Sequence, residues 1–347
     1  MSSTGDDRNR LLYRWDLDKT YLRTEFDTLR DVVRTAFEPA ARKRTVPGAA
    51  ALLRELAGTD PYGVFILSGS PEQMRRVLEA KLRLDGVRWD SFTLKPSLSN
   101  LIRGRFRFLK DQVGYKLGAL LASRVNVPLE IDEVLFGDDA EADAFTYSLY
   151  ADLCADRIGS DTLVAVLERA RVHPEEIPGL VRLAERVPRR DACRRIFIHL
   201  DRMSPPEVFD ELGKRVCPFY NYLQPALVLV DAGSLPAAGA LRVAAELVRE
   251  EAFTADALVA SYMDLSRRAV IGSHAAAELA REMRSADPGA FASSGAVLRG
   301  FVDALELEVG DLAEMSTPEQ GVIDYVALFS RDKARARAAR RRAIARG

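Results

Sequence analysis

The chain has 347 residues, 48% of them hydrophobic and 29% charged, with a formal net charge of −1. This composition is ordinary for a globular protein that buries a large core, and it excludes a uniformly basic nucleic-acid binder. Three sparse cysteines do not make a disulfide framework, and the sequence has neither a signal-peptide pattern nor an apolar run of membrane-spanning length. We therefore expect a cytoplasmic protein of two or three domains.

Strand and helix patterns alternate through the first 200 residues. After a disordered lead-in at 1–10, short apolar runs predict buried strands at 11–15, 64–67, 131–136 and 196–199. Helical spacing predicts helices between them, at 29–37, 49–56, 71–82 and 115–123. This alternation predicts an α/β domain with a parallel sheet that is flanked by helices on both faces.

The pattern changes toward the C-terminus. The α/β domain is expected to span 11–215, with a helical insertion at about 158–195. Ala/Leu/Val-rich helical periodicity predicts an all-α domain at 216–330, which offers a surface for a partner protein.

The tail at 331–347 has eight Lys or Arg against one Asp. We consider three roles for this tail: a solvated helix or disorder, contact with an anionic membrane surface, and contact with nucleic acid.

Polar residues follow the first two predicted strands. Ligand sites in open α/β sheets form at the carboxyl ends of strands, so this placement indicates a site. Asp16 and Asp18 are two positions apart in the sequence. They offer a nucleophile with a neighbouring acid/base, provided that a cation offsets their repulsion. Ser68, with the amides of Gly69 and Ser70 at a predicted helix start, makes a natural phosphate cradle.

Acidic residues follow the strand predicted at 131–136. They are Asp138, Asp139 and Asp143. A set of carboxylate oxygens selects a hard cation, and Mg²⁺ is the usual one with phosphate substrates. The sequence pattern leaves open whether Asp139 or Asp143 joins Asp138 as the second metal ligand.

Basic side chains are needed to complete a phosphate site. A lysine would neutralise phosphate charge in the transition state, and Lys116 is the best candidate, with Lys110 and Lys95 in reserve. His199, beside Asp201 at the end of a predicted strand, is either a core residue or a second catalytic group.

Four short motifs occur in an order that resembles the haloacid-dehalogenase-type phosphatases. Asp-Leu-Asp-Lys-Thr at 16–20 matches their first motif, DxDxT, and Phe-Ile-Leu-Ser at 65–68 matches the second. Lys116 matches the third motif, and the acidic run at 137–143 matches the fourth. Together they imply the Rossmann-like fold of that superfamily, a parallel sheet flanked by helices.

The resemblance also implies a role for each matching residue. Asp16 is implied as the nucleophile that becomes phosphorylated, and Asp18 as the general acid/base. The implied phosphate-binding residues are Thr20, which also holds the loop, Ser68, Gly69 and Lys116. The implied Mg²⁺ ligands are Asp16, Asp18 through its backbone carbonyl, Asp138, and Asp143 or Asp139.

Within that superfamily, residues 10–155 resemble the catalytic domain of actin-patch phosphatidate phosphatases and their bacterial relatives. The shared features are Val-Pro-Gly at 46–48, Phe-Ile-Leu-Ser-Gly-Ser-Pro at 65–71, Leu-Lys-Asp at 109–111 before Tyr115-Lys116, and Gly-Asp-Asp at 137–139 followed by Asp143. Two positions depart from that family. Lys19 replaces the second of two adjacent acids, and Asp139 replaces a serine.

The sequence thus predicts a Mg²⁺-dependent phosphatase that acts through an aspartyl-phosphate on Asp16. Its expected partner is a phosphorylated small molecule or lipid, with phosphatidate or another phospholipid phosphate as one candidate. One alternative is a phosphatase of nucleotides or nucleic-acid ends. Another is a non-catalytic adaptor that binds a partner through its helical half.

Overall fold

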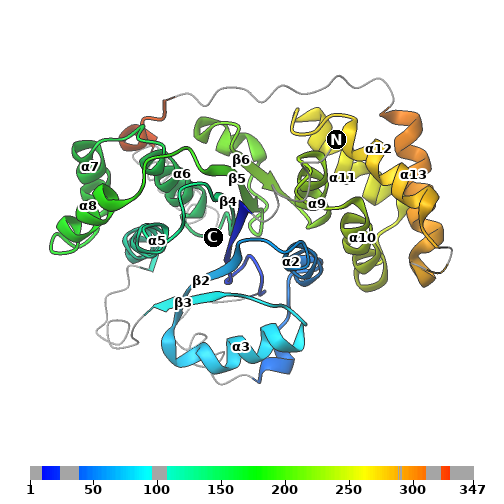
Figure 1. The fold of residues 1–347 in the computed structure, drawn as a ribbon, viewed down its shortest axis with the longest axis horizontal. Coiled ribbons are helices and arrows are strands. Elements are labelled where there is room, and N and C mark those ends of the chain that lie inside the picture. Colours follow the sequence, from blue (N-terminus) through cyan, green and yellow to red (C-terminus); the bar gives the residue numbers. More distant parts are fainter. Residues whose placement is uncertain are drawn as a thin grey trace, which may run out of the picture.

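The computed structural model describes residues 10–23, 39–95, 108–287, 289, 291–309 and 322–328. In this part of the chain, six parallel strands form one sheet in the order β3-β2-β1-β4-β5-β6 (Figure 1). The strands are β1 (Leu11–Asp16), β2 (Gly63–Pro71), β3 (Ser91–Lys95), β4 (Asp132–Asp138), β5 (Cys193–His199) and β6 (Val216–Phe219). The predicted α/β class with a parallel sheet is confirmed.

The four predicted strands are present as β1, β2, β4 and β5, but the two edge strands were not predicted. β3 is short and mostly half-buried, and β6 contains Pro218, which an edge strand tolerates because one side of its backbone needs no partner. Since β6 begins at Val216, the sheet extends into the stretch that was expected to be all-helical. The expected helix at 29–37, the basic tail at 331–347 and nearly all of the lead-in at 1–10 lie outside the described residues.

Four helices cover one face of the sheet, on the left in Figure 1. They are α5 (Phe108–Arg124), α6 (Asp143–Cys154), α7 (Ser160–Ala170) and α8 (Ile177–Arg186). Leu163 of α7 and Leu180 of α8 share one buried cluster with Leu117 of α5 and Leu135 of β4. The stretch at 158–195 thus contains two helices before β5 begins, and both pack on α5 within this buried cluster.

The opposite face carries the remaining helices. They are α2 (Ala49–Ala57), α3 (Arg75–Leu84), α9 (Leu223–Asp231), α10 (Ala237–Glu251), α11 (Ala255–Arg267), α12 (His274–Ser285) and α13 (Gly295–Glu308), with short 3-10 turns at Ala40–Arg42, Glu72–Met74 and Ala292–Ser294. A further 3-10 turn, Pro206–Leu212, contacts β6 and α6. Trp15 of β1 stacks on Phe136 of β4 and on Tyr222 beside α9, with ring centroids 3.9 and 5.8 Å apart. The C-terminal helices thus share a continuous core with the sheet.

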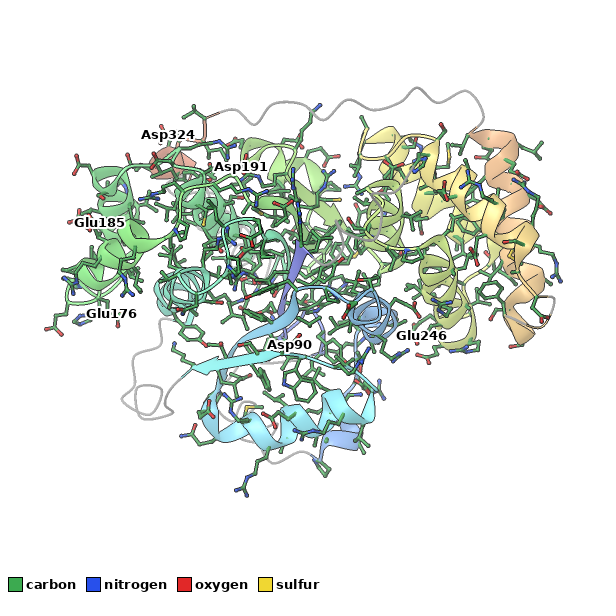
Figure 2. All side chains as sticks on the ribbon, in the orientation of Figure 1. Asp90, Glu176, Glu185, Asp191, Glu246 and Asp324 are labelled. Atoms are coloured by element: carbon green, nitrogen blue, oxygen red, sulfur yellow. The ribbon has the colours of Figure 1, made fainter. Side chains whose placement is uncertain are left out.

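Residues 322–328 lie against α6, far from α13 (Figures 1 and 2, where Asp324 is labelled). Tyr325 is buried, and its hydroxyl donates to Asp152 Oδ2 at 2.7 Å. Its ring packs edge-on against Phe145, with 5.6 Å between centroids. This contact anchors the C-terminal part of the chain to the helix that begins at Asp143. Among the described helices, none combines the length and apolar character needed to span a bilayer.

Candidate active site

The chain makes a tight turn directly after β1. The backbone amide of Leu22 donates to the Leu17 carbonyl, and that of Lys19 donates to the Leu22 carbonyl, both at 2.9 Å. Lys19 has φ of 58°, a left-handed conformation that is uncommon for a residue with a side chain and that often marks functional loops. The Thr20 hydroxyl lies 3.3 Å from Asp16 Oδ2, to which it donates. The turn therefore holds the Asp16 carboxylate in one orientation.

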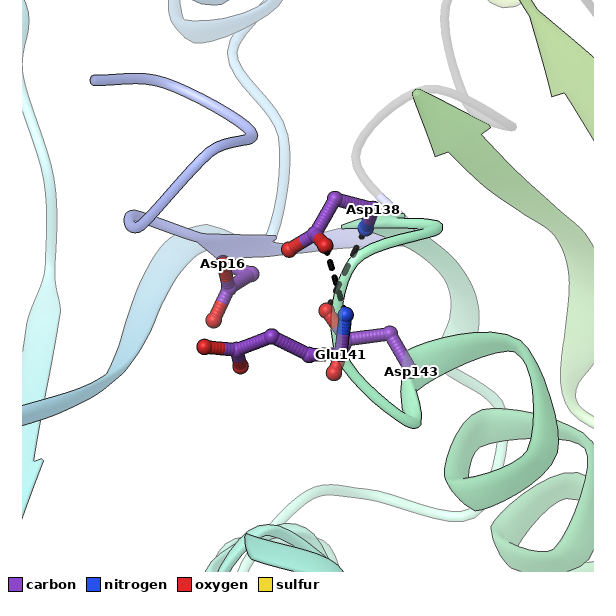
Figure 3. Close-up of side chains that lie close together, drawn as sticks. All are labelled: Asp16, Asp138, Glu141 and Asp143. Atoms are coloured by element: carbon purple, nitrogen blue, oxygen red, sulfur yellow. Dashed lines mark hydrogen bonds between the residues drawn. The ribbon is translucent and has the colours of Figure 1, made fainter. Parts of the chain in front are cut away.

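Four acidic side chains converge at the carboxyl ends of β1 and β4 (Figure 3). Asp16 ends β1, Asp138 ends β4, Glu141 follows in the turn, and Asp143 begins α6; one oxygen of each lies within 4.8 Å of the others. Gly137 permits this approach, because a Cβ at that position would lie 2.6 Å from Asp143 Cβ. A side chain at 137 would push α6 away from the sheet.

The turn after β4 is closed by Asp138 itself. Its Oδ1 accepts hydrogen bonds from the amides of Ala140, at 2.6 Å, and Glu141, at 2.9 Å. The Asp138 amide donates to Asp143 Oδ2 at 3.3 Å. Asp138 Oδ2 is buried and has no hydrogen-bond partner among the described residues. Such an oxygen could be satisfied by a bound cation or by a proton, and burial raises the pKa of Asp138.

Asp139 points away from these acids. Its carboxylate accepts hydrogen bonds from the amides of Arg202, at 2.8 Å, and Ser204, at 3.1 Å, in the loop after β5. Of the two residues left open by the sequence, Asp143 lies in the acidic cluster and Asp139 caps a neighbouring loop.

Lys116 of α5 lies among the acids. Its Nζ is 2.8 Å from Asp16 Oδ1, 2.7 Å from Glu141 Oε2 and 2.5 Å from Asp143 Oδ1, and its side chain is 1% exposed. Burial opposes the charge of this ammonium, but attraction to Asp143 and Asp16 outweighs burial and raises the pKa of Lys116 well above its ordinary value. Of the reserve lysines, Lys95 lies over the ring of Tyr115, and the side chain at 110 lies outside the described residues.

Asp18 is held by the serines that follow the apolar part of β2. The hydroxyls of Ser68 and Ser70 donate to Asp18 Oδ2 at 2.8 and 3.0 Å. The Ser70 amide donates to Ser68 Oγ at 3.0 Å. It is therefore not free to bind phosphate, although the sequence predicted that it would be. Strand β2 runs through Gly69 to Pro71, and the expected helix start lies further along the chain because this stretch pairs with β3.

The site carries more negative than positive charge. Its acidic side chains are Asp16, Asp18, Asp138, Glu141 and Asp143, and Lys116 contacts Asp16, Glu141 and Asp143. Burial is the main cause that raises the pKa of Asp16, Asp18 and Asp138 above the ordinary value. Burial also raises the pKa of Asp143 to about 6, although attraction to Lys116 opposes the shift. Crowded carboxylate oxygens of this kind fit a hard divalent cation.

This crowding predicts how stability depends on pH. In the metal-free protein the folded Asp143 binds a proton up to about pH 6, whereas its ordinary pKa is 3.8. Since the folded state holds the extra proton, the free energy of unfolding contributed by this group falls as pH rises from about 4 to above 6, by up to about 3 kcal/mol.

Mg²⁺ competes with protons for the same oxygens. Thermal unfolding with EDTA and with Mg²⁺ should show a larger Mg²⁺-induced rise in Tm at pH 7.5 than at pH 5. An equal rise at both pH values would contradict cation binding by these carboxylates.

Three residues near the site had no assigned role from sequence or were left open. Glu141 lies in the acidic cluster, although the sequence favoured its aspartate neighbours. The Tyr222 hydroxyl, next to α9, donates to the Thr20 carbonyl, and His199 Nδ1 lies 3.0 Å from the Lys19 carbonyl. The position of His199 at a strand end was a usable signal, whereas nothing around Tyr222 in the sequence marked it.

The carboxyl edge of β2, β1 and β4 thus combines two aspartates on one turn, a buried lysine and a group of acids that could hold a metal ion. No protein-family model, curated protein or solved structure matches this chain.

Proposed function

We propose that this chain is a Mg²⁺-dependent phosphatase of the haloacid-dehalogenase type, which hydrolyses a phosphomonoester through an aspartyl-phosphate on Asp16. The observation that carries the proposal is the convergence of Asp16, Asp18, Ser68, Lys116 and the acids after β4, which come from separate parts of the sequence. The sheet order supports it, because β2 and β4 flank β1 and bring their ends to the same place.

In the first step an Asp16 carboxylate oxygen attacks phosphorus, and the bond from phosphorus to the leaving oxygen breaks. Thr20 and Lys116, which contact the two Asp16 oxygens, orient this carboxylate. Asp18 donates a proton to the leaving oxygen. Burial raises its pKa, and this direction favours the protonated form that a general acid needs.

In the second step Asp18, now ionised, accepts a proton from water. The resulting hydroxide oxygen bonds to phosphorus, the bond to Asp16 breaks, and inorganic phosphate leaves. Hydrogen bonds from Ser68 and Ser70 stabilise the ionised form of Asp18 between the two steps.

The cation would be held by Asp16, Asp138 and Asp143, with Glu141 beside them. Mg²⁺ bound there supplies positive charge that offsets the phosphate and the carboxylates. An all-carboxylate donor set is of the type that this ion prefers.

A magnesium-dependence assay tests the proposal. With 4-nitrophenyl phosphate as substrate, we expect hydrolysis in Mg²⁺, loss of activity in EDTA, and recovery when Mg²⁺ is restored. Asp139→Asn should keep activity within about threefold, because its carboxylate faces the loop after β5. If no phosphoester in a broad panel is hydrolysed, the proposal fails and a non-catalytic adaptor is favoured.

A further inference from the structure

A cavity of about 580 Å³ opens beside the turn that follows β1. Its wall includes Lys19 of that turn, His199 and Asp201 after β5, Tyr220 after β6, and Leu247 and Phe253 from the end of α10 and the residues after it. The C-terminal half of the chain therefore builds much of the wall. The volume is in the range of pockets that hold small organic ligands.

The hydrogen bond of His199 fixes which of its ring nitrogens carries the hydrogen. Its Nδ1 lies 3.0 Å from the Lys19 carbonyl oxygen, which can only accept, so Nδ1 is the donor. Burial lowers the pKa of His199, which favours the neutral ring. The Nε2 atom is then an acceptor, and the described part of the chain gives this ring no second hydrogen bond. His199 is itself among the residues that line the cavity.

The rest of the wall is close to neutral. Lys19 and Arg23 are balanced by Asp201 and Glu251, and the Arg23 guanidinium pairs with Glu251 at 3.7 Å. Asp201 is exposed and adds further acceptor oxygens. A ligand that meets these acceptors must offer hydroxyl or amine hydrogens, and a wall without net charge gives no preference for a second anionic group.

Aromatic and apolar side chains form the remaining surface. Tyr220 is 37% exposed, and Met203 is 69% exposed, so both offer area that a ligand could cover. Phe253 and Leu247 line the same cavity. Flat apolar surface next to hydrogen-bond acceptors suits a ring that carries hydroxyl groups.

We propose that this cavity holds the leaving group of the substrate, and that this group is a neutral ring with hydroxyl groups, as in a sugar or a nucleoside. Its hydroxyls donate to His199 Nε2 and Asp201, and its ring packs on Tyr220 and Phe253. The inference rests on the proposed phosphatase function. His199 and Lys19 connect the cavity to the turn that carries Asp16 and Asp18.

Steady-state kinetics of the Mg²⁺-loaded full chain test this inference. We compare AMP and glucose 6-phosphate with glycerol 3-phosphate, which has no ring, and with dispersed phosphatidate. At least one ring-bearing substrate should have a kcat/KM about tenfold or more above both comparators, a difference of about 1.4 kcal/mol. AMP against glucose 6-phosphate separates a nucleoside from a sugar. A preference for glycerol 3-phosphate or phosphatidate overturns the inference.

Two substitutions locate the effect. Tyr220→Leu should raise KM for the preferred ring-bearing substrate about tenfold more than it raises KM for glycerol 3-phosphate. His199→Asn, which keeps an N–H near the Nδ1 position but removes the Nε2 acceptor, should act in the same direction. Tyr62→Leu is the matched control, because Tyr62 is 40% exposed and does not line the cavity. Equal losses for all substrates in Tyr220→Leu contradict the inference.

A binding measurement separates failure of this inference from failure of the phosphatase proposal. Saturation-transfer NMR with uridine and methyl glucoside reports binding of a neutral ring without any turnover. We expect a signal in the wild type and in Tyr62→Leu, and no signal in Tyr220→Leu. This result supports the cavity as a ring site, even if no phosphoester is hydrolysed. Hydrolysis of 4-nitrophenyl phosphate without a signal from either probe supports the phosphatase and overturns the ring site.

Discussion

Asp16→Asn is expected to lower kcat for 4-nitrophenyl phosphate hydrolysis by about 10⁴-fold or more, because an amide is a poor nucleophile toward phosphorus. The substitution keeps the side-chain shape and keeps an oxygen that can accept the Thr20 hydrogen bond. It also removes a carboxylate from a buried cluster in which burial, and after it the neighbouring acids, raise the pKa of Asp16. The metal-free variant should therefore unfold at the same temperature as the wild type or a higher one.

The measurement pairs phosphate release with thermal unfolding of the same samples. Asp139→Asn is the matched control, since it makes the same chemical change at the residue after Asp138, on a carboxylate that caps the loop after β5. Asp139→Asn should remain active and Asp16→Asn should not. If a folded Asp16→Asn protein kept a tenth of the wild-type rate, the nucleophile would have to be another group.

Strand-end reasoning from the sequence placed most of this site. Asp16 and Asp138 were expected to meet because each follows a buried strand, and β1 and β4 are indeed neighbours. Lys116 lies on a predicted helix, and its contact with both strand ends is visible only once α5 is packed on the sheet. The need for a positive charge at a phosphate site, rather than helical periodicity, made this lysine the best candidate, and the motif order implied the same residue.

The sequence could not show which of the acids after β4 face inward. Asp138, Asp139, Glu141 and Asp143 follow one another closely, and their directions depend on the turn. Because Asp138 Oδ1 accepts the two amides that follow, the chain closes tightly and directs Asp139 outward and Glu141 inward. Such a turn depends on backbone hydrogen bonds that residue spacing does not specify.

The edge strands and the long-range contacts could not be predicted from the sequence for a different reason. The five residues of β3 bury little, and β6 contains a proline, so neither has the apolar run that marks a central strand. The contact between Tyr222 and Thr20 joins residues 202 positions apart and has no local pattern. This contact couples the start of the C-terminal helices to the turn that carries Asp16 and Asp18.

The crowding of carboxylates around Lys116 makes Lys116→Met the substitution with the largest expected effect on stability. The ammonium contacts Asp16, Glu141 and Asp143, and its replacement by a neutral side chain of similar length leaves these carboxylates without their cation. Removing one partner of a buried ion pair costs about 3–5 kcal/mol. We expect a loss of this size in the free energy of unfolding of the metal-free protein at pH 7.5.

Conditions that protonate the acids or bring them another cation should reduce this loss in the free energy of unfolding. At pH 5 the carboxyls with raised pKa hold more protons, Asp143 among them, so less repulsion remains for Lys116 to offset. Mg²⁺ should restore part of the lost Tm at pH 7.5, because it brings positive charge to the same oxygens. Phosphatase activity should stay low even then, since the ammonium that orients Asp16 and would meet the phosphate is gone.

Denaturant unfolding of Lys116→Met and Lys95→Met, with and without Mg²⁺, checks this expectation. Lys95 is the control because it is a half-buried lysine that contacts the ring of Tyr115 rather than the acids. Equal stability of the two variants at pH 7.5 would mean that the buried acids do not depend on Lys116 for their charge balance. A loss in Lys116→Met that is relieved at pH 5 and by Mg²⁺, while Lys95→Met is unaffected, would identify the lysine and the cation as two sources of positive charge for one set of carboxylates.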